Sequence, residues 1–402
     1  MAFDWTAEPW TSVEQQSFDW RDLVRHPISK LDTDAFTRIR VMLLAAVEGE
    51  SCAFLEAGAR QHPDHRLAIN RVCRVEHFER TLLKMRLPPD FSPVEKAIAV
   101  EQLAIEIGAL IAQRERDPAV AAVYRFLVPE HVDHLYRLSA LLDRTEGKDP
   151  NNILQSYTDI RPGRSTSDQH RAPEDDLGTP EIPGPPKIGT LLLSTLAVAL
   201  AADKRDFYAA EGPLLSDPAA RMLFAELGAV AEQHLLRAIS LVEKPTPWLD
   251  QWLVHEALKA WCYHSCRESE TDPAQRAVWS RLLDYEAGHI RYVADLIRAE
   301  GRDPLAIVPK RLPDPLLFAP QRAWIRTILT QERDLRAAGP RFVPRAEETE
   351  AAPASIVWRR RLHALGIPSE SVAAGYRWVP GTELTQTGPE ETVGAVRETV
   401  EQ

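Results

Sequence analysis

One stretch decides the fold predicted for this chain: Leu282-Leu283-Asp284-Tyr285-Glu286-Ala287-Gly288-His289-Ile290-Arg291-Tyr292-Val293. At helical spacing, Leu282, Glu286, His289, Val293 and Leu296 share one face, which is the face that a helix buries. Because a carboxylate and an imidazole are costly to bury unpaired, the pair needs a partner. Two interpretations stand side by side: two ligands of a metal ion, or two buried polar residues that bond each other.

Composition limits the classes of protein to consider. The 402 residues predict two domains plus extensions, and 44% hydrophobic and 27% charged residues are ordinary for a soluble globular protein. The net charge of -11 and the lack of a Lys/Arg cluster argue against nucleic-acid binding. The longest apolar run, residues 188–202, is too short to span a bilayer.

The ends and the cysteines indicate the compartment. The N-terminus carries neither a basic region nor an apolar core typical of a signal peptide. Four cysteines in 402 residues do not make a disulfide scaffold. A reducing cytoplasm is therefore the expected location.

The order of helical and proline-rich segments predicts an all-α protein made of two tandem antiparallel four-helix bundles. We expect an irregular arm over 1–32, with Trp5, Trp10 and Trp20 packed on the first domain, and a proline-rich linker over 146–187. The bundles occupy 33–145, with helices near 33–58, 65–86, 93–116 and 118–143, and 188–302, with helices near 188–211, 217–242, 247–270 and 273–300. An irregular extension over 303–402 contains a helix near 320–338 and ends in a flexible tail.

The two bundles read as one unit used twice. Asp117-Pro118 and Asp272-Pro273 stand at the same junction, 155 residues apart. The same offset brings Glu101 onto Glu256 and His134 onto His289. The second helices contribute His77 and His234 at nearly this offset, and in the first helices Glu48 falls opposite Ala201.

With these residues in register, the sequence resembles the ferritin-like superfamily of rubrerythrins, bacterioferritins and di-iron oxidases. The resemblance covers about 33–143 and 188–300. It implies that helices one and three each supply a Glu, and that helices two and four each supply Glu-x-x-His, to two metal ions.

The second bundle matches this pattern at His234, Glu256, Glu286 and His289, whereas Ala201 and Ala231 stand where two carboxylates would be. Two imidazoles and two carboxylates suit one Fe(II), Mn(II) or Zn(II) ion, so a mononuclear site is expected.

The first bundle matches at Glu48, His77, Glu101 and His134. Arg74 and His131 occupy the two remaining Glu positions, and Glu130 is an alternative ligand beside His131. The competing interpretation of this bundle is a buried polar network in which Arg74 neutralises Glu48 and Glu101.

The resemblance implies a non-haem metal protein of oxidoreductase type, with iron in the bundle core and O2, a peroxide or another small molecule as substrate. The alternative is a non-catalytic, degenerate ferritin-like scaffold that binds a partner. Residues 392–397, Thr-Val-Gly-Ala-Val-Arg, are similar to the peptides that dock cargo proteins inside encapsulin shells. We also expect the two bundles to pack against each other within the chain.

Overall fold

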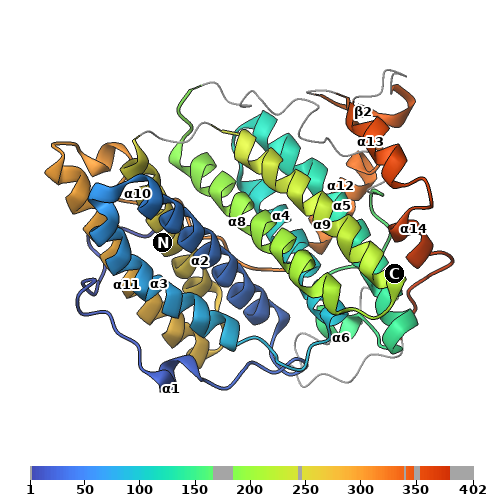
Figure 1. Cartoon of the computed structure of the whole chain (residues 1–402), viewed down its shortest axis with the longest axis horizontal. Helices are drawn as coiled ribbons and strands as arrows, with labels where there is room; N and C mark the ends of the chain where they lie inside the picture. The colour runs from blue at the N-terminus through green and yellow to red at the C-terminus, as the bar shows by residue number, and fades with distance from the viewer. Residues whose placement is uncertain (1, 166–183, 243–246, 339–340, 348–353, 381–402) are drawn as a thin grey trace.

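The computed structural model describes residues 2–165, 184–242, 247–338, 341–347 and 354–380. Within them the regular secondary structure is almost entirely helical, which confirms the all-α prediction (Figure 1). The long helices form four hairpins of consecutive helices. Their bounds are α2 Ala35–Gln61, α3 Arg66–Met85, α4 Pro93–Arg114, α5 Pro118–Glu146, α8 Ile188–Glu211, α9 Pro218–Ser240, α10 Trp248–Ser269 and α11 Pro273–Ala299.

Local capping signals set where these helices begin. Asp117, Asp217 and Asp272 each precede a proline, and each carboxylate accepts hydrogen bonds from backbone N–H groups of the first turn. Ser92 begins α4 with a capping box completed by Glu95. Because such signals depend on a few adjacent residues, the expected helix bounds agree with the structure to within about one turn.

The hairpins pack across the two halves of the chain. The α2–α3 hairpin lies with α10–α11, a set called group A from here on, and α4–α5 lies with α8–α9, called group B (Figure 1). Contacts of α2 with α8, and of α10 with α8, join the two groups. This grouping differs from the consecutive bundles expected over 33–145 and 188–302, since each half supplies one hairpin to each group.

The buried charges give the physical reason for this exchange. Consecutive packing would place Glu48, Glu76 and Glu79 in one core with Glu101 and without either of the two lysines that are buried in the described part of the chain. Both buried lysines, Lys204 on α8 and Lys259 on α10, would then share the other core. Exchanging the hairpins gives each acidic core one ammonium group, which buried carboxylates require.

The N-terminal arm includes the short helix α1 Trp20–Leu23 and packs on group A rather than on a first-half domain. Trp5 is buried and its indole N–H donates to the Pro309 carbonyl at 2.9 Å. Trp10 and Trp20 are exposed, in contrast to the expectation that all three tryptophans pack. The 3₁₀ segments are Pro63–His65, Gly212–Leu214, Pro304–Ala306 and Arg345–Glu347.

The segments after each half are short. Within the expected linker, α6 Asn151–Leu154 forms a single buried turn. The helix expected near 320–338 is shorter: α12 Arg322–Glu332 is followed by an antiparallel hairpin of β1 Leu335–Ala338 and β2 Arg341–Pro344. Phe342 of β2 stacks on Phe126 of α5, a contact that a continued helix would lose. The helices α13 Ala354–Leu362 and α14 Pro368–Val372 follow. Residues 392–397 lie outside the described residues.

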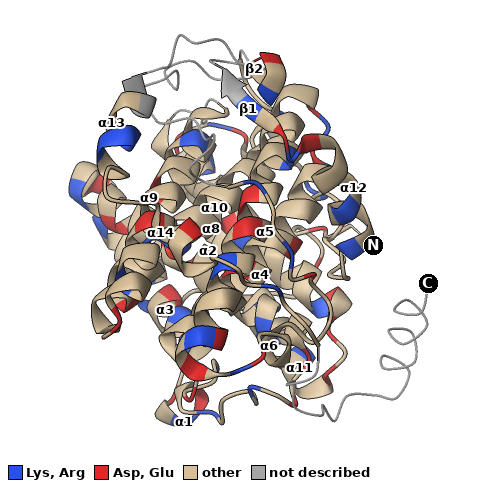
Figure 2. Ribbon diagram, turned by 90° about the vertical axis from the view of Figure 1, so that its right-hand side faces the viewer, with Lys and Arg blue, Asp and Glu red and all other residues tan. Residues whose placement is uncertain are grey.

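Two further features concern the surroundings of the protein. Among the described residues, no helix combines the length and the apolar character needed to cross a membrane. Lysine and arginine residues are interspersed with aspartate and glutamate in the view of Figure 2, rather than gathered on one side. The lack of a nucleic-acid partner stays a prediction.

The exchange of hairpins predicts how the chain behaves once it is cut. A protease site inserted within 166–183 would separate α2–α5 from α8–α11. Because each group needs a hairpin from both fragments, the fragments should stay together and elute on a sizing column with the uncut protein. Two separately eluting fragments that both keep full helical circular dichroism would show that the halves fold alone.

Candidate functional site

Group A encloses a cluster of charged side chains in its core, and every member is fully buried. The members come from all four helices: Glu48 from α2, Glu76 and Glu79 from α3, Glu256, Lys259 and Tyr263 from α10, and Glu286 and His289 from α11.

Lys259 lies at the centre of the carboxylates. Its Nζ is 2.8 Å from Oε2 of Glu256 and 3.0 Å from Oε2 of Glu286, and it also contacts Glu76. Glu48 is more distant, with 4.0 Å between its Oε2 and the ammonium nitrogen. One ammonium group thus joins carboxylates from three or four helices, as a cation bound in this core would.

The tautomer of His289 is set by Gln16 of the N-terminal arm. The Gln16 amide nitrogen donates to the carbonyls of Thr11 and Tyr285, both at 2.9 Å, so its oxygen must face the other way. That oxygen lies 2.7 Å from Nε2 of His289, which therefore carries a hydrogen. The Nδ1 atom is left facing the carboxylates, at 3.5 Å from Glu286.

Among the five carboxylates of this buried cluster, Glu79 is the one that Lys259 does not contact. Neither of its oxygens has a hydrogen-bond partner among the described residues. One ligand atom each from Glu79, Glu286 and His289 lies within 4.8 Å of the others, as do atoms of Glu76, Glu256 and His289. Both sets have the spacing that allows them to hold a metal ion.

The pKa values of three carboxyl groups in the core of group A indicate that this core has too few positive charges. Burial raises the pKa of Glu48 and Glu79 well above the ordinary glutamate value. Burial also raises the pKa of Glu76 to about 7, although Lys259 opposes the rise. Carboxyl groups in such a place take up a proton unless a cation is added.

Two groups next to Lys259 have pKa values that are shifted in the opposite sense, toward the charged form. Burial opposes the charged form of Glu256, but the ammonium of Lys259 prevails and lowers the pKa of that carboxyl. Burial likewise disfavours the charged form of His289, yet Glu286 and Glu256 raise the pKa of the imidazole to about 9. Five carboxyl groups therefore share one ammonium and one imidazolium, which leaves a deficit of positive charge.

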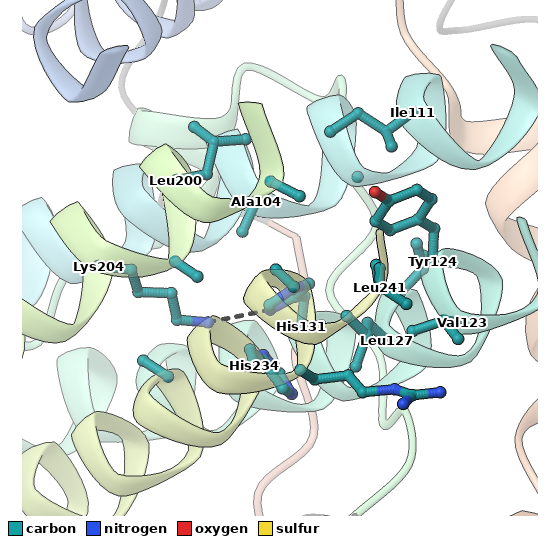
Figure 3. Close-up of a pocket in the computed structure, with 17 residues that line it drawn as sticks. Ala104, Ile111, Val123, Tyr124, Leu127, His131, Leu200, Lys204, His234 and Leu241 are labelled. Atoms are coloured by element: carbon teal, nitrogen blue, oxygen red, sulfur yellow. Dashed lines mark hydrogen bonds between the residues drawn. The ribbon is translucent and has the colours of Figure 1, made fainter. Parts of the chain in front are cut away.

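Group B contains a second lysine-centred cluster with a different composition. Nζ of Lys204 is 2.8 Å from Oε2 of Glu101 and 3.3 Å from Nδ1 of His134. It is also 2.9 Å from Nδ1 of His131, the contact drawn as a dashed line in Figure 3. The phenol of Tyr208 donates to the other oxygen of Glu101 at 2.6 Å. Glu101, His131 and His134 also have the spacing of metal ligands, and Lys204 occupies the place between them.

The Lys204 cluster pairs its ammonium group with one carboxylate, that of Glu101. Although burial opposes it, Lys204 together with His134 keeps the pKa of Glu101 well below its ordinary value. Burial, aided by Lys204, lowers the pKa of His131 to about 3, so this imidazole is neutral. His234 bonds Glu130 through Nε2 at 2.6 Å, and burial lowers the pKa of His234.

The structure rearranges the predicted ligand sets. His234 does not join Glu256, Glu286 and His289: it lies in group B against Glu130, because α9 packs with α5. Glu48, expected with Glu101 and His134, instead lies in group A. The expected ligands thus divide as Glu48, Glu256, Glu286 and His289 in group A, and Glu101, Glu130, His131, His134 and His234 in group B.

The expected inward face of α3 is wrong by two residues in register. Arg74 and His77 are exposed, so His77 is not a ligand and Arg74 neutralises no core carboxylate. Glu76 and Glu79 are fully buried instead. The signal was present in the sequence, since both glutamates share a face with the apolar Val72 and Leu83.

The buried face of α3 also corrects the alignment between the two halves of the repeat. Shifted by 155 residues, the offset of the third and fourth helices, Glu76 and Glu79 fall on Ala231 and His234. Sequence analysis also missed Lys204, Lys259 and Gln16. Both lysines lie at helical spacing within apolar faces, which was a usable signal, whereas the role of Gln16 depends on where the arm packs.

Comparison with known proteins adds no relative: no family model, curated protein or solved structure matches this chain. The ferritin-like relationship therefore stays a prediction from the sequence, and the function must be argued from the two clusters.

Close packing at Gly288 allows a test of whether the N-terminal arm holds His289 in place. A Cβ atom at this position would meet the Thr11 carbonyl oxygen at 2.0 Å and Nε2 of Gln16 at 2.9 Å. Gly288→Ala should therefore displace the arm and free His289, and the Thr11 and Gln16 amides should exchange hydrogen at least about tenfold faster as a local opening. Gly108→Ala is the matched control, because the added methyl there has room. Unchanged exchange in Gly288→Ala would mean that the arm does not hold His289.

Proposed function

We propose that this protein is a non-haem metal protein of oxidoreductase type and that its metal centre lies in group A. The centre holds one divalent cation through Glu79, Glu286 and His289, with Glu48 close by, while Lys259 takes the place of a second cation. The observation that carries the proposal is Glu79: a fully buried carboxylate without a hydrogen-bond partner, beside a second carboxylate and an imidazole.

Charge supports a cation at this place. An unpaired buried carboxylate is costly, and a divalent ion would offset the excess of carboxylates over Lys259. His289 would release the proton on Nδ1 and bind the ion as a neutral imidazole. The unbonded Nδ1 of His289 points to the same region. Oxygen-rich donors with one imidazole suit iron or manganese better than a thiolate-preferring metal, so iron is proposed first, then manganese or zinc.

The relationship that fits this centre is the ferritin-like one, with groups A and B as two four-helix bundles. Group A supplies Glu48 and Glu256 as the single carboxylates, and Glu286-x-x-His289 on one helix. Glu76-x-x-Glu79 replaces the second Glu-x-x-His, and Lys259 replaces one metal ion. A mononuclear centre follows from the lysine.

The residues around the proposed ion have separate tasks. A bound iron or manganese ion would supply redox chemistry, with O2, a peroxide or another small molecule as substrate. Gln16 fixes the tautomer of His289 so that Nδ1 can bind, which is the usual task of a residue behind a metal-binding histidine. The Tyr263 phenol donates to Glu48 at 2.8 Å and holds that carboxylate in place. Full burial of these residues excludes bulk water.

Group B fits the alternative that the sequence left open, a degenerate site kept as a structural polar network. Lys204 fills the place between Glu101, His131 and His134, and its ammonium group pairs with the single carboxylate there. In this proposal, the two groups have diverged: one keeps a metal centre, and the other keeps the scaffold.

Metal content tests the proposal directly. Plasma mass spectrometry of the purified protein should find about one divalent transition metal ion per chain. Glu79→Gln combined with Glu286→Gln should abolish most of it, because both variants keep shape but lose ligand charge. Glu101→Gln in group B is the matched control and should leave the metal content unchanged. Equal metal in the double variant and the parent would refute the site.

Replacing Lys259 tests whether the lysine stands in for a second ion. Lys259→Met should raise the metal content from about one to two ions per chain, because the carboxylates of Glu76 and Glu256 lose their ammonium partner and are then free to bind a second ion. With metal removed by a chelator, the variant should lose about 3–5 kcal/mol of unfolding free energy, measured in urea, as buried carboxylates lose their partner. Lys96→Met, which removes a surface ion pair only, should change neither value.

A further inference from the structure

A cavity of about 60 Å³ lies in group B, beside the lysine-centred cluster (Figure 3). Its wall is mostly apolar, and at one end it meets Lys204, His131 and His234. Small residues from the helices keep it open: Ala104 and Gly108 from α4, Ala197 and Ala201 from α8, and Ala231 and Ala238 from α9.

The position of this cavity follows from the internal repeat. Ala201 and Ala231 line it, and they stand where group A has Glu48 and Glu76. Each alanine is smaller than a glutamate and carries no charge. The same two replacements that remove metal ligands from group B therefore also leave apolar space in its core.

Two polar atoms at the cavity lack partners among the described residues. The phenol oxygen of Tyr124 makes no hydrogen bond, and Figure 3 shows it directed toward the interior of the ring of lining side chains. His234 donates from Nε2 to Glu130, so its Nδ1, also without a partner, is an acceptor. A buried polar group without a partner costs free energy, which a bound molecule could recover.

We propose that this cavity binds a short-chain, neutral aliphatic alcohol. One water needs roughly 10–15 Å³ of such space, so the cavity accommodates about four to six non-hydrogen atoms. The apolar wall takes the hydrocarbon chain. A hydroxyl group is both donor and acceptor, so it can accept from Tyr124 or donate to His234.

The charges around the cavity select against ionic ligands. Lys204 is already paired with Glu101 at 2.8 Å, and a carboxylate placed beside them would add an unmatched negative charge. An alkylammonium ion would likewise meet Lys204. Burying an unpaired charge is far costlier than burying a hydroxyl that finds a partner.

The test uses the full chain labelled with ¹³C in its alanine methyl groups, titrated with 1-butanol. The methyl signals of Ala201 and Ala231 should shift and saturate, while that of Ala202, which is not part of the cavity wall, should not. Butyrate and butylammonium should bind at least about tenfold more weakly. Shifts that grow linearly in all three methyl groups would show a solvent effect and overturn the proposal.

Two variants separate binding in the cavity from binding elsewhere. Ala201→Leu fills the cavity and should abolish saturable shifts at Ala231, whereas Ala202→Leu should preserve them. Tyr124→Phe keeps the cavity and should weaken the binding of 1-butanol by about five- to tenfold if the phenol donates a hydrogen bond to the ligand hydroxyl. Retained saturable binding in a folded Ala201→Leu protein would place the ligand elsewhere. This proposal is independent of the metal centre, so metal content should not change in any of these variants.

Discussion

The ammonium groups of Lys259 and Lys204 are the constraint on which the arrangement of helices depends. Each lies in a core that contains carboxylates brought from several helices, and each is almost or fully buried. A buried carboxylate without a positive partner opposes folding by several kcal/mol, so acidic hairpins can pack only where an ammonium group meets them. The α2–α3 hairpin carries three such glutamates and receives Lys259 from α10, while Glu101 of α4 receives Lys204 from α8.

The exchange of hairpins has a consequence for function. Had each half folded by itself, the two lysines would meet only Glu256 and Glu286, and the first half would contain unmatched carboxylates. In the observed arrangement, the cluster of group A has more carboxylates than Lys259 can balance, whereas the cluster around Lys204 in group B has one carboxylate, Glu101, paired with the ammonium group. The excess in group A is what makes it the candidate for a cation.

The two groups show how one repeated unit can acquire two uses. At matching positions, group A has Glu48 and Glu76 where group B has Ala201 and Ala231. Keeping carboxylates favours a metal ion, and replacing them by alanine leaves apolar space next to a polar cluster. The arm adds a difference that the repeat does not contain, because Gln16 contacts His289 and reaches it through the close approach at Gly288.

Sequence alone determined the helices and the kind of residue in their cores. Asp-Pro junctions such as Asp117-Pro118 act within a few residues, so helix bounds could be predicted from local chemistry. The Glu286-x-x-His289 pair likewise indicated that its own helix places polar side chains in the core. Which helices share a core was decided only in the tertiary structure, because it depends on pairing charges far apart in the chain, as between Lys259 and Glu76. For that reason, His234 was assigned to the wrong ligand set. The inward position of Glu79, in contrast, could have been predicted from the face that it shares with Val72 and Leu83.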